Sequence, residues 1–234
     1  MAALTALQHQ TLMANPWFSS LPDRVRQDIV AHSGTRAFDR GERILSRGDP
    51  GTAFYAILDG VVQVSGTSLI GRMAVLTFYL PGAWFGEISL LDGKPRTHDV
   101  GAHTDLLLLA LGAANFELLL ATHAEFSRSL LRLECERLRA MSVAMESTAT
   151  HSPEQRLAGR LVELARNYGS PTAKGLRIDM NLPQETLACL IGISRQRINQ
   201  IFKHWVDDGL IEQHYGHLIL RDDAAMEALA SGGY

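Results

Sequence analysis

From about residue 34 to residue 111, short runs of β-prone residues alternate with turns rich in glycine and aspartate. The runs that carry this pattern are residues 35–38, 43–45, 54–58, 61–64 and 106–111. The last run consists of six consecutive apolar residues, which is typical of a buried strand. A helical segment at residues 15–31, broken early by Pro22, precedes the strands. Short strands with frequent turns predict a β-sandwich or a β-barrel.

After residue 113 the pattern changes to helical periodicity. Residues 123–146 contain neither glycine nor proline, and they predict one long helix. Along this helix a set of residues recurs at steps of four and three: Leu131, Cys135, Leu138, Ser142 and Met145. That spacing is typical of two helices packed side by side, so it predicts a dimer seam. Ser142 is the exception within the seam, because a polar residue there costs stability unless it specifies something.

The same helix carries a second apolar stripe, formed by Phe126, Leu130, Leu133 and Met141. We expect one stripe to pack on the β domain and the other on a partner subunit. The alternative is a helix that packs only on its own domain and has no partner.

Residues 150–153, with the sequence Thr-His-Ser-Pro, break the helical pattern. Ser152 followed by Pro153 is a favourable helix start, and a further helix is expected at residues 154–168. The capping box is weak, because Gln155 rather than glutamate stands three places after Ser152. We therefore divide the chain into a β domain with flanking helices at residues 1–122, a long helix at 123–150 and a C-terminal domain at 151–234.

The C-terminal domain contains the sharpest local pattern of the chain. Residues 183–190 predict a helix, Gly192 a turn, and Ser194 the N-cap of a second helix that runs to about Asp208. Tyr215 and Gly216 then lie between two β-prone segments, as in a hairpin. A helix, a glycine-containing turn, a second helix and a hairpin predict a winged helix-turn-helix.

In such a motif the second helix enters the major groove of DNA with its N-terminal end. The candidate DNA-binding residues at that end are Ser194, Arg195, Gln196, Arg197, Asn199, Gln200 and Lys203. Arginine can form paired bonds with guanine and glutamine with adenine. Residues 195–203 contain three cations and no acid, which suits phosphate contacts. The alternative is an ordinary solvated helix face.

Composition and charge limit the classes of protein that remain. Of the 234 residues, 46% are hydrophobic and 20% are charged, and the formal net charge is −3. A disordered chain is excluded, and no apolar run approaches the roughly 18 residues of a membrane-spanning helix. The negative charge argues against non-specific coating of nucleic acid or membranes, although it allows a local basic patch. Two cysteines, Cys135 and Cys189, cannot build a disulfide framework, and the N-terminus lacks the features of a signal peptide, so we expect a cytoplasmic location.

Within the β domain, residues 84–97 place Glu87 and Arg96 on either side of a short loop in otherwise apolar surroundings. An arginine opposite a short helix N-terminus binds phosphate, and a neighbouring carboxylate can accept a ribose hydroxyl. The alternative is a plain salt bridge between Glu87 and Arg96.

The segment Phe-Gly-Glu-Ile-Ser-Leu-Leu at residues 85–91, followed by Gly-Lys-Pro-Arg-Thr at 93–97, resembles the phosphate-binding cassette of cyclic-nucleotide-binding domains. Gly-Asp-Pro at 48–50 and the run at 54–60 resemble the earlier turn and strand of that domain. With the long helix and the winged helix-turn-helix, residues 15–222 resemble the Crp/Fnr family of bacterial transcription regulators. The resemblance implies an α+β fold, with an N-terminal β-roll or jelly-roll effector domain, a long dimerisation helix and a C-terminal winged helix-turn-helix.

The resemblance also implies an effector, cAMP or cGMP, and the residues that bind it: Gly86, Glu87, Ile88, Ser89, Arg96, Thr97 and Ser142. Arg96 would pair with the cyclic phosphate, Glu87 would accept the ribose 2′-hydroxyl, and Ser142 would reach the base from the seam. In the second helix Arg195, Gln196 and Gln200 would read bases. The implied partners are a near-palindromic double-stranded DNA operator, a second copy of the chain and RNA polymerase, and no membrane.

Two departures from the family pattern leave the effector open. His98 stands where these domains usually carry alanine, and Met141 replaces a second polar residue that faces the base. One alternative is therefore a degenerate pocket that responds to cyclic di-GMP or to no small ligand. Another is a nucleotide-binding regulatory subunit that does not bind DNA.

No motif of nucleophilic, phosphate-cradling or metalloprotease type occurs, so we expect neither catalytic residues nor an enzyme. His214 and His217 flank the predicted hairpin turn without a third ligand nearby in the sequence. We expect them to contact phosphate or solvent, and we expect no metal.

Overall fold

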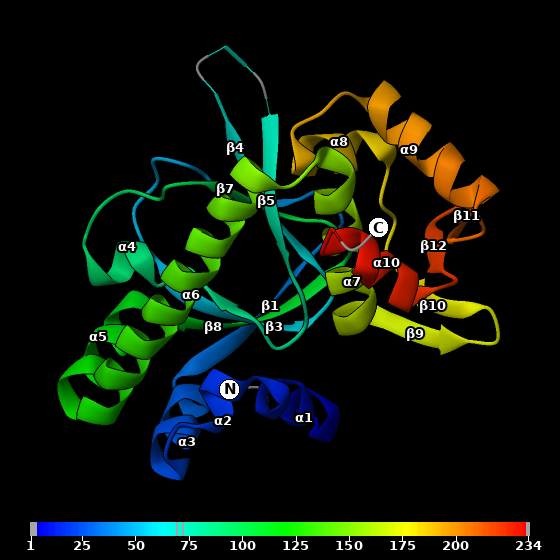
Figure 1. Cartoon of the computed structure of the whole chain (residues 1–234). Helices are drawn as coiled ribbons and strands as arrows, with labels where there is room; N and C mark the ends of the chain where they lie inside the picture. Colours follow the sequence, from blue (N-terminus) through cyan, green and yellow to red (C-terminus); the bar gives the residue numbers. More distant parts are fainter. Residues whose placement is uncertain (1–3, 69, 72, 233–234) are drawn as a thin grey trace. The chain divides into compact units, whose positions relative to one another are not determined.

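A computed structural model describes residues 4–68, 70–71 and 73–232, and its mixture of helices and sheets confirms the expected α+β class (Figure 1). The chain forms two compact units, residues 1–66 with 76–139 and residues 67–75 with 140–234. Among the described helices, none combines the length and the apolar character needed to cross a membrane.

The β domain contains two four-stranded sheets. One sheet has the order β1 (Ser33–Phe38), β8 (Leu106–Gly112), β3 (Ala53–Asp59) and β6 (Trp84–Phe85). The other has the order β2 (Arg43–Leu45), β7 (Asp99–Ala102), β4 (Val62–Thr67) and β5 (Met73–Tyr79). The strands expected from the sequence overlap β1, β2, β3, β4 and β8, whereas β5, β6 and β7 were not among them.

Strand β3 is buried on both faces, because each face meets a different core. Tyr55 and Ile57 pack in a core shared with residues of the second sheet, including Val62 and Val100. Phe54 alternates with them and packs in a second core, built with the flanking helices.

Helices cover the outer face of the first sheet. They are α1 (Ala6–Ala14), α2 (Pro16–Ser19), α3 (Asp23–Ala31), α5 (Ala113–Thr122) and the first part of α6 (Ala124–Thr150), while the short α4 (Ile88–Leu91) follows β6. The expected break at Pro22 lies between α2 and α3. Trp17 packs edge-on against Phe54 and Trp84, and its Nε1 donates to the Ser129 carbonyl of α6 at 3.0 Å. This contact fixes the start of the long helix on the β domain.

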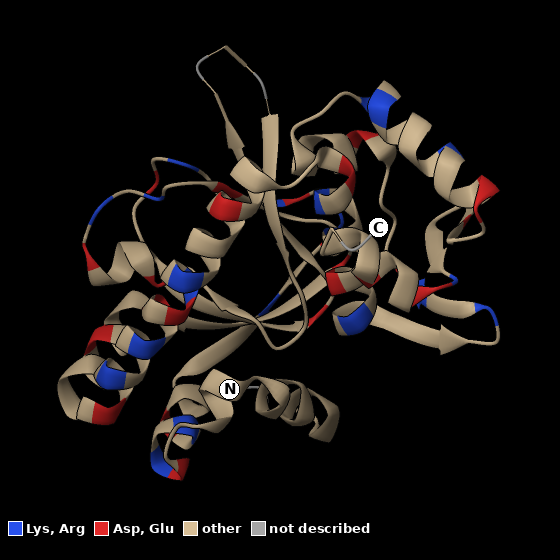
Figure 2. Cartoon of the chain, viewed as in Figure 1, with Lys and Arg blue, Asp and Glu red and all other residues tan. Residues whose placement is uncertain are grey.

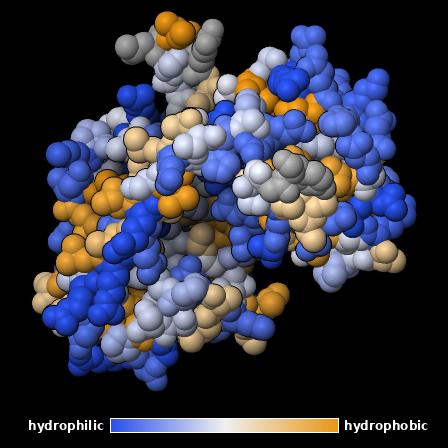
Figure 3. All heavy atoms as spheres, viewed as in Figure 1, coloured by the Kyte–Doolittle hydropathy of each residue, from blue (hydrophilic) through white to orange (hydrophobic). Residues whose placement is uncertain are grey.

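Helix α6 extends over 27 residues and ends at Thr150. Phe126 and Leu130 are buried and Leu133 is half-buried, as expected for the stripe that packs on the β domain. Met141 is 62% exposed, so its assignment to that buried stripe was wrong. The proposed seam residues Leu131, Cys135, Leu138, Ser142 and Met145 are all exposed in the single chain. The space-filling view shows apolar residues reaching the surface along α6 (Figure 3).

The second unit contains the C-terminal elements. They are α7 (Pro153–Tyr168), β9 (Gly169–Thr172), β10 (Gly175–Ile178), α8 (Gln184–Ile191), α9 (Arg195–Asp207), β11 (Ile211–His214), β12 (His217–Leu220) and α10 (Asp223–Ala230). The four strands form one sheet in the order β11-β12-β10-β9. The expected helix-turn-helix and hairpin are α8, α9, β11 and β12, while β9, β10 and α10 were not foreseen. Gln155 forms both hydrogen bonds of a capping box with Ser152. The expectation of a weak capping box at the start of α7 was therefore wrong.

Candidate functional site

The backbone at Gly86 shapes the first candidate site, in the β domain. Gly86 lies between β6 and α4 with φ +94°, a left-handed conformation that favours glycine. A Cβ at this position would lie 3.0 Å from the Ala53 carbonyl oxygen and 3.3 Å from Arg96 Nη1. Glycine is therefore required both by the turn and by the close approach of Arg96.

Arg96 is 5% exposed, and local backbone bonds hold it in place. Its N–H donates to the Asp49 carbonyl at 2.8 Å, and its carbonyl accepts from Gly48 N–H at 2.9 Å. The guanidinium donates from Nη1 to the Gly86 carbonyl and from Nη2 to the Ala53 carbonyl at 3.0 Å. Its Nε is buried without a hydrogen-bond partner. Burial lowers the pKa of Arg96, although Tyr55 and Glu87 oppose the shift. A buried cation with an unsatisfied donor suits an anionic ligand.

Glu87 is 1% exposed and pairs with Arg137 of α6. The alternative of a Glu87–Arg96 salt bridge therefore does not describe this site, where Arg137 takes that role. Arg137 also donates to the Trp84 carbonyl, so one side chain ties α6 to both β6 and the cassette. The second oxygen of Glu87, Oε2, is buried without a hydrogen-bond partner. A buried acceptor of this kind is matched to a hydroxyl or N–H donor.

Sequence reasoning missed Arg137 and its neighbours Glu134 and Tyr79. Arg137 Nη1 lies 3.2 Å from Glu134 Oε1, one turn earlier on α6. Burial by itself lowers the pKa of Arg137, but Glu87, Tyr79 and Glu134 together raise it. Burial raises the pKa of Tyr79. The available sequence signal was the i,i+3 pair of Glu134 and Arg137 on a helix face, which is usually a surface pair.

The other expected effector residues differ from one another in burial and in position. Ser89 is buried in α4, and a Cβ on Gly51 would lie 2.8 Å from its carbonyl oxygen, whereas Ile88 is 45% exposed. Thr97 is exposed, with its hydroxyl 2.9 Å from His98 Nδ1. Ser142 lies in the second compact unit, on the exposed part of α6. The structure thus brings Gly86, Glu87 and Arg96 together.

The second candidate site is the N-terminal end of α9. Gly192 has φ +78° and turns the chain between α8 and α9, and the Ser194 hydroxyl caps α9 by accepting from Arg197 N–H at 3.2 Å. Ile198, Ile201, Phe202 and Trp205 form the buried face, as expected. The candidate DNA-binding residues Ser194, Arg195, Gln196, Arg197, Asn199, Gln200 and Lys203 are all exposed. Basic residues gather at this end of the helix (Figure 2).

Trp205 anchors this helix to α7. Its indole Nε1 donates to Glu154 Oε1 at 2.9 Å, and the tryptophan itself is 1% exposed. Because Glu154 lies in the first turn of α7, the bond fixes α9 against the helix that follows the break at residues 150–153.

The hairpin of β11 and β12 carries a fully exposed Tyr215 at its turn. His214 and His217 face each other across the two strands, and their rings stack with centroids 4.7 Å apart. His214 Nε2 also lies 3.2 Å from Glu212 Oε2. Within the described part of the chain, no group of three or more histidine, cysteine, aspartate or glutamate side chains is arranged to hold a metal ion.

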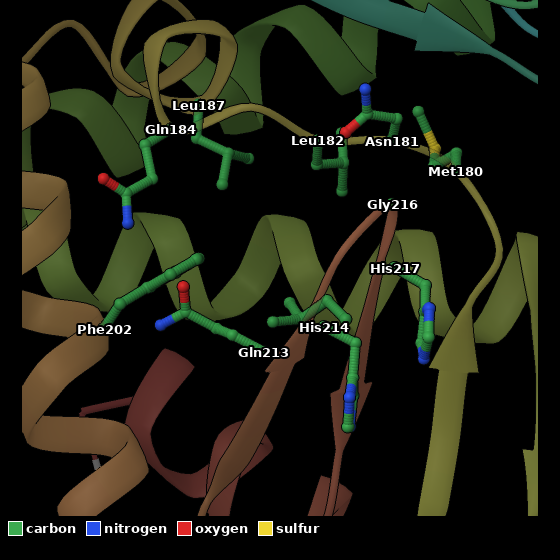
Figure 4. A pocket seen from close by; sticks show the side chains of 11 residues that line it. Met180, Asn181, Leu182, Gln184, Leu187, Phe202, Gln213, His214, Gly216 and His217 are labelled. Carbon is green, nitrogen blue, oxygen red and sulfur yellow. The ribbon is translucent and has the colours of Figure 1, made fainter.

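A small cavity of about 60 Å³ lies between this hairpin and the helix-turn-helix (Figure 4). Leu187 of α8, Phe202 of α9 and Gln213 of β11 are among the side chains that line it. Sites for small organic ligands measure roughly 300–1,000 Å³, so this cavity is too small for a nucleotide.

Comparisons with known proteins match the two segments of the chain that contain the candidate sites. Residues 35–123 match the model of the cyclic nucleotide-binding domain, and residues 155–229 match the Crp-like helix-turn-helix domain. The chain is 29% identical over 185 residues to a CRP-like cAMP-activated global transcriptional regulator of Mycobacterium tuberculosis, covering 79% of this chain and 83% of that protein. It is 27% identical to the cyclic AMP receptor protein of Thermus thermophilus, covering 94% and 99%.

Solved structures support the same fold. A transcriptional regulator of the CRP/FNR family from Thermus thermophilus is 27% identical, with a TM-score of 0.65 and coverage of 85% of this chain and 98% of that one. The c-di-GMP responsive global regulator of Xanthomonas campestris has a TM-score of 0.73 at 20% identity, covering 86% and 100%, which supports the fold alone.

Proposed function

This chain belongs to the Crp/Fnr family of transcription regulators, which are not enzymes, and from that premise we propose that a cyclic mononucleotide bound in its β domain controls its binding to DNA. The observation that carries the proposal is that two buried, incompletely bonded groups occur together beside Gly86 in the β domain. Arg96 has a free Nε donor and Glu87 has a free Oε2 acceptor. An unsatisfied cation beside an unsatisfied carboxylate suits a ligand that presents a phosphate and a hydroxyl group together.

In this proposal each group of the ligand has its own partner. The cyclic phosphate pairs with Arg96, with Gly86, Ile88, Ser89 and Thr97 around it, and the ribose 2′-hydroxyl donates to Glu87 Oε2. Arg137 orients Glu87, because it holds the other carboxylate oxygen. Ser142 reaches the base. We favour cAMP as the effector, since two relatives that span most of this chain are named for cAMP.

The pocket is tested by calorimetric titration of the full chain with cAMP, cGMP and cyclic di-GMP. We expect cAMP or cGMP to bind, and Arg96→Ala to weaken binding by about one to two decades, because a charge-assisted contact contributes roughly 1.5–3 kcal/mol. Arg36→Ala is the control, since Arg36 is exposed on β1. Binding of cyclic di-GMP alone, or of none of the three, would overturn the assignment to a cyclic mononucleotide.

The DNA side of the proposal rests on α9. Its apolar face is buried and its opposite face presents amides and cations without an acid from Arg195 to Lys203. We propose that Arg195, Gln196 and Gln200 contact base edges in the major groove and that Lys203 contacts phosphate.

The symmetry of the proposed DNA site follows from the proposed dimer. We propose a homodimer through Leu131, Cys135, Leu138, Ser142 and Met145, which places two copies of α9 on a near-palindromic site. RNA polymerase is the proposed partner at the promoter.

A further inference from the structure

Two carboxylates share one guanidinium nitrogen beside the proposed effector pocket. Glu87, from the turn before α4, and Glu134, from α6, both place their Oε1 against Nη1 of Arg137, at 3.2 Å for Glu134. Glu87 is 1% exposed and the side chains of Arg137 and Glu134 are 23% and 31% exposed. The proposed binding scheme assigns no role to Glu134.

The charges of this cluster do not balance. One guanidinium faces two carboxylates, and Tyr79 of β5, which is electrostatically linked to all three, stays neutral because burial raises its pKa. Arg96 is the other cation coupled to Glu87. A second negative charge at partly buried positions favours uptake of a proton by one of the two carboxyl groups.

Of the two carboxyl groups, we expect Glu134 to accept this proton. Burial raises its pKa, the neighbouring Glu87 raises it further, and Arg137 opposes the shift. Both carboxylates contact the same nitrogen of Arg137, so a protonated Glu134 would lie next to the Glu87 carboxylate and could donate to it. Glu87 Oε2 is the acceptor left without a partner.

We propose that a proton on Glu134 and the ribose hydroxyl of the effector compete for the carboxylate of Glu87, which makes Glu134 a positioning residue that links nucleotide affinity to pH. The inference rests on the proposed function, since it uses the same Glu87 contact. Binding of the nucleotide then expels the proton from Glu134. Affinity therefore falls as the pH falls through the pKa of Glu134, by at most about tenfold per pH unit for one proton.

The test is calorimetric titration of the full-length protein with cAMP and cGMP between about pH 5 and about pH 8. The 2′-deoxy analogue of each nucleotide serves as a probe without the competing hydroxyl. We expect the wild-type protein to lose affinity for the ribonucleotide toward acid pH, and the 2′-deoxy analogue to lack this component of the pH dependence. This comparison needs no mutation, so it does not depend on the folding of a variant.

Two substitutions separate the charge of Glu134 from its ability to donate. Glu134→Leu removes both, so the pH slope should disappear and affinity at acid pH should exceed that of the wild type. Glu134→Gln donates an amide to Glu87 at every pH, so it should bind about tenfold more weakly at alkaline pH, without a slope. Glu136→Gln is the matched control, because Glu136 is exposed on the same helix, and it should keep the wild-type slope.

The outcomes distinguish the two proposals. If the nucleotides bind but Glu134→Leu keeps the wild-type slope, or the 2′-deoxy analogue shows the same slope, the role of Glu134 is wrong while the pocket stands. If neither cAMP nor cGMP binds at any pH, the proposed function fails and this inference fails with it.

Discussion

Gly86 is the residue at which a single methyl group would test the geometry of the pocket. Its backbone has φ +94°, and a Cβ would crowd the Ala53 carbonyl and Arg96 Nη1. Gly41 has a similar φ of +88° but would place its Cβ in open space. An alanine would therefore strain the backbone at both positions, but only at Gly86 would its Cβ crowd neighbouring atoms.

We expect both Gly86→Ala and Gly41→Ala to cost roughly 1–3 kcal/mol of unfolding free energy from backbone strain. Gly86→Ala should cost about 1 kcal/mol more, because the added methyl overpacks the site. It should also weaken nucleotide binding, since Arg96 must shift, whereas Gly41→Ala should bind normally. Urea unfolding and calorimetry measure both effects. Equal losses of stability and unchanged affinity would contradict the close approach.

A local motif lets the sequence mark single residues as candidates. The cassette marks Glu87 and Arg96, and in the structure Arg96 donates to the carbonyl of Gly86, the residue before Glu87. Arg137 is not marked, because its contact with Glu87 joins residues 50 positions apart and depends on how α6 packs. Local spacing cannot encode such a pairing, and the only salt bridge that the sequence offered for Glu87 was the alternative pair with Arg96.

Helix α9 is the element on which the proposed DNA recognition depends. We expect Arg195→Ala to cost about 1–3 kcal/mol on the preferred operator and to relax the preference at one guanine. Lys203→Ala should weaken binding to all DNA sequences equally. It should also reduce the slope of log affinity against log salt concentration by about one. The two variants are matched, since each removes one exposed cation from the same helix.

Selection from a random oligonucleotide pool, followed by salt titrations on the selected site, measures these differences. If Arg195→Ala selects the same consensus sequence as the wild type, the proposal that Arg195 contacts base edges is wrong. A loss confined to one sequence for Lys203→Ala would contradict its phosphate contact.

Helices and strands can be predicted from the sequence where caps, turns or periodicity mark them. α8 and α9 carry a cap, a glycine turn and a 3.6-residue period, so the sequence predicts them within one residue or so of the observed bounds. β5 and the pair of β9 and β10 escape detection, since their residues are partly exposed and lack clear alternation. Their formation depends on tertiary pairing rather than on local pattern.

At the scale of the whole molecule, the exposed apolar residues of α6 support the proposed dimer. Leu131, Leu138 and Met145 are 68%, 65% and 72% exposed in the single chain, although they recur at seam spacing. A contiguous exposed stripe of this kind marks an interaction surface. The sequence predicts the seam, but it cannot show which copy or protein covers it.

We expect Leu138→Lys to disrupt the dimer, because burying an unpaired ammonium in an apolar interface is costly. Leu118→Lys is the control, since Leu118 is 48% exposed on α5 and is not one of the proposed seam residues. Light scattering without DNA gives the mass of each variant. A dimer that survives Leu138→Lys would remove this residue from the interface.

The central claim is that a cyclic mononucleotide controls binding of this chain to DNA, and operator affinity with and without nucleotide tests it most directly. Fluorescence anisotropy on the selected operator, at fixed salt, measures that affinity. Coupling between two sites is typically worth roughly 1–3 kcal/mol, so we predict a change of about tenfold or more on saturation with cAMP or cGMP, and its loss in Arg96→Ala. An operator affinity that no cyclic mononucleotide changes would contradict the account.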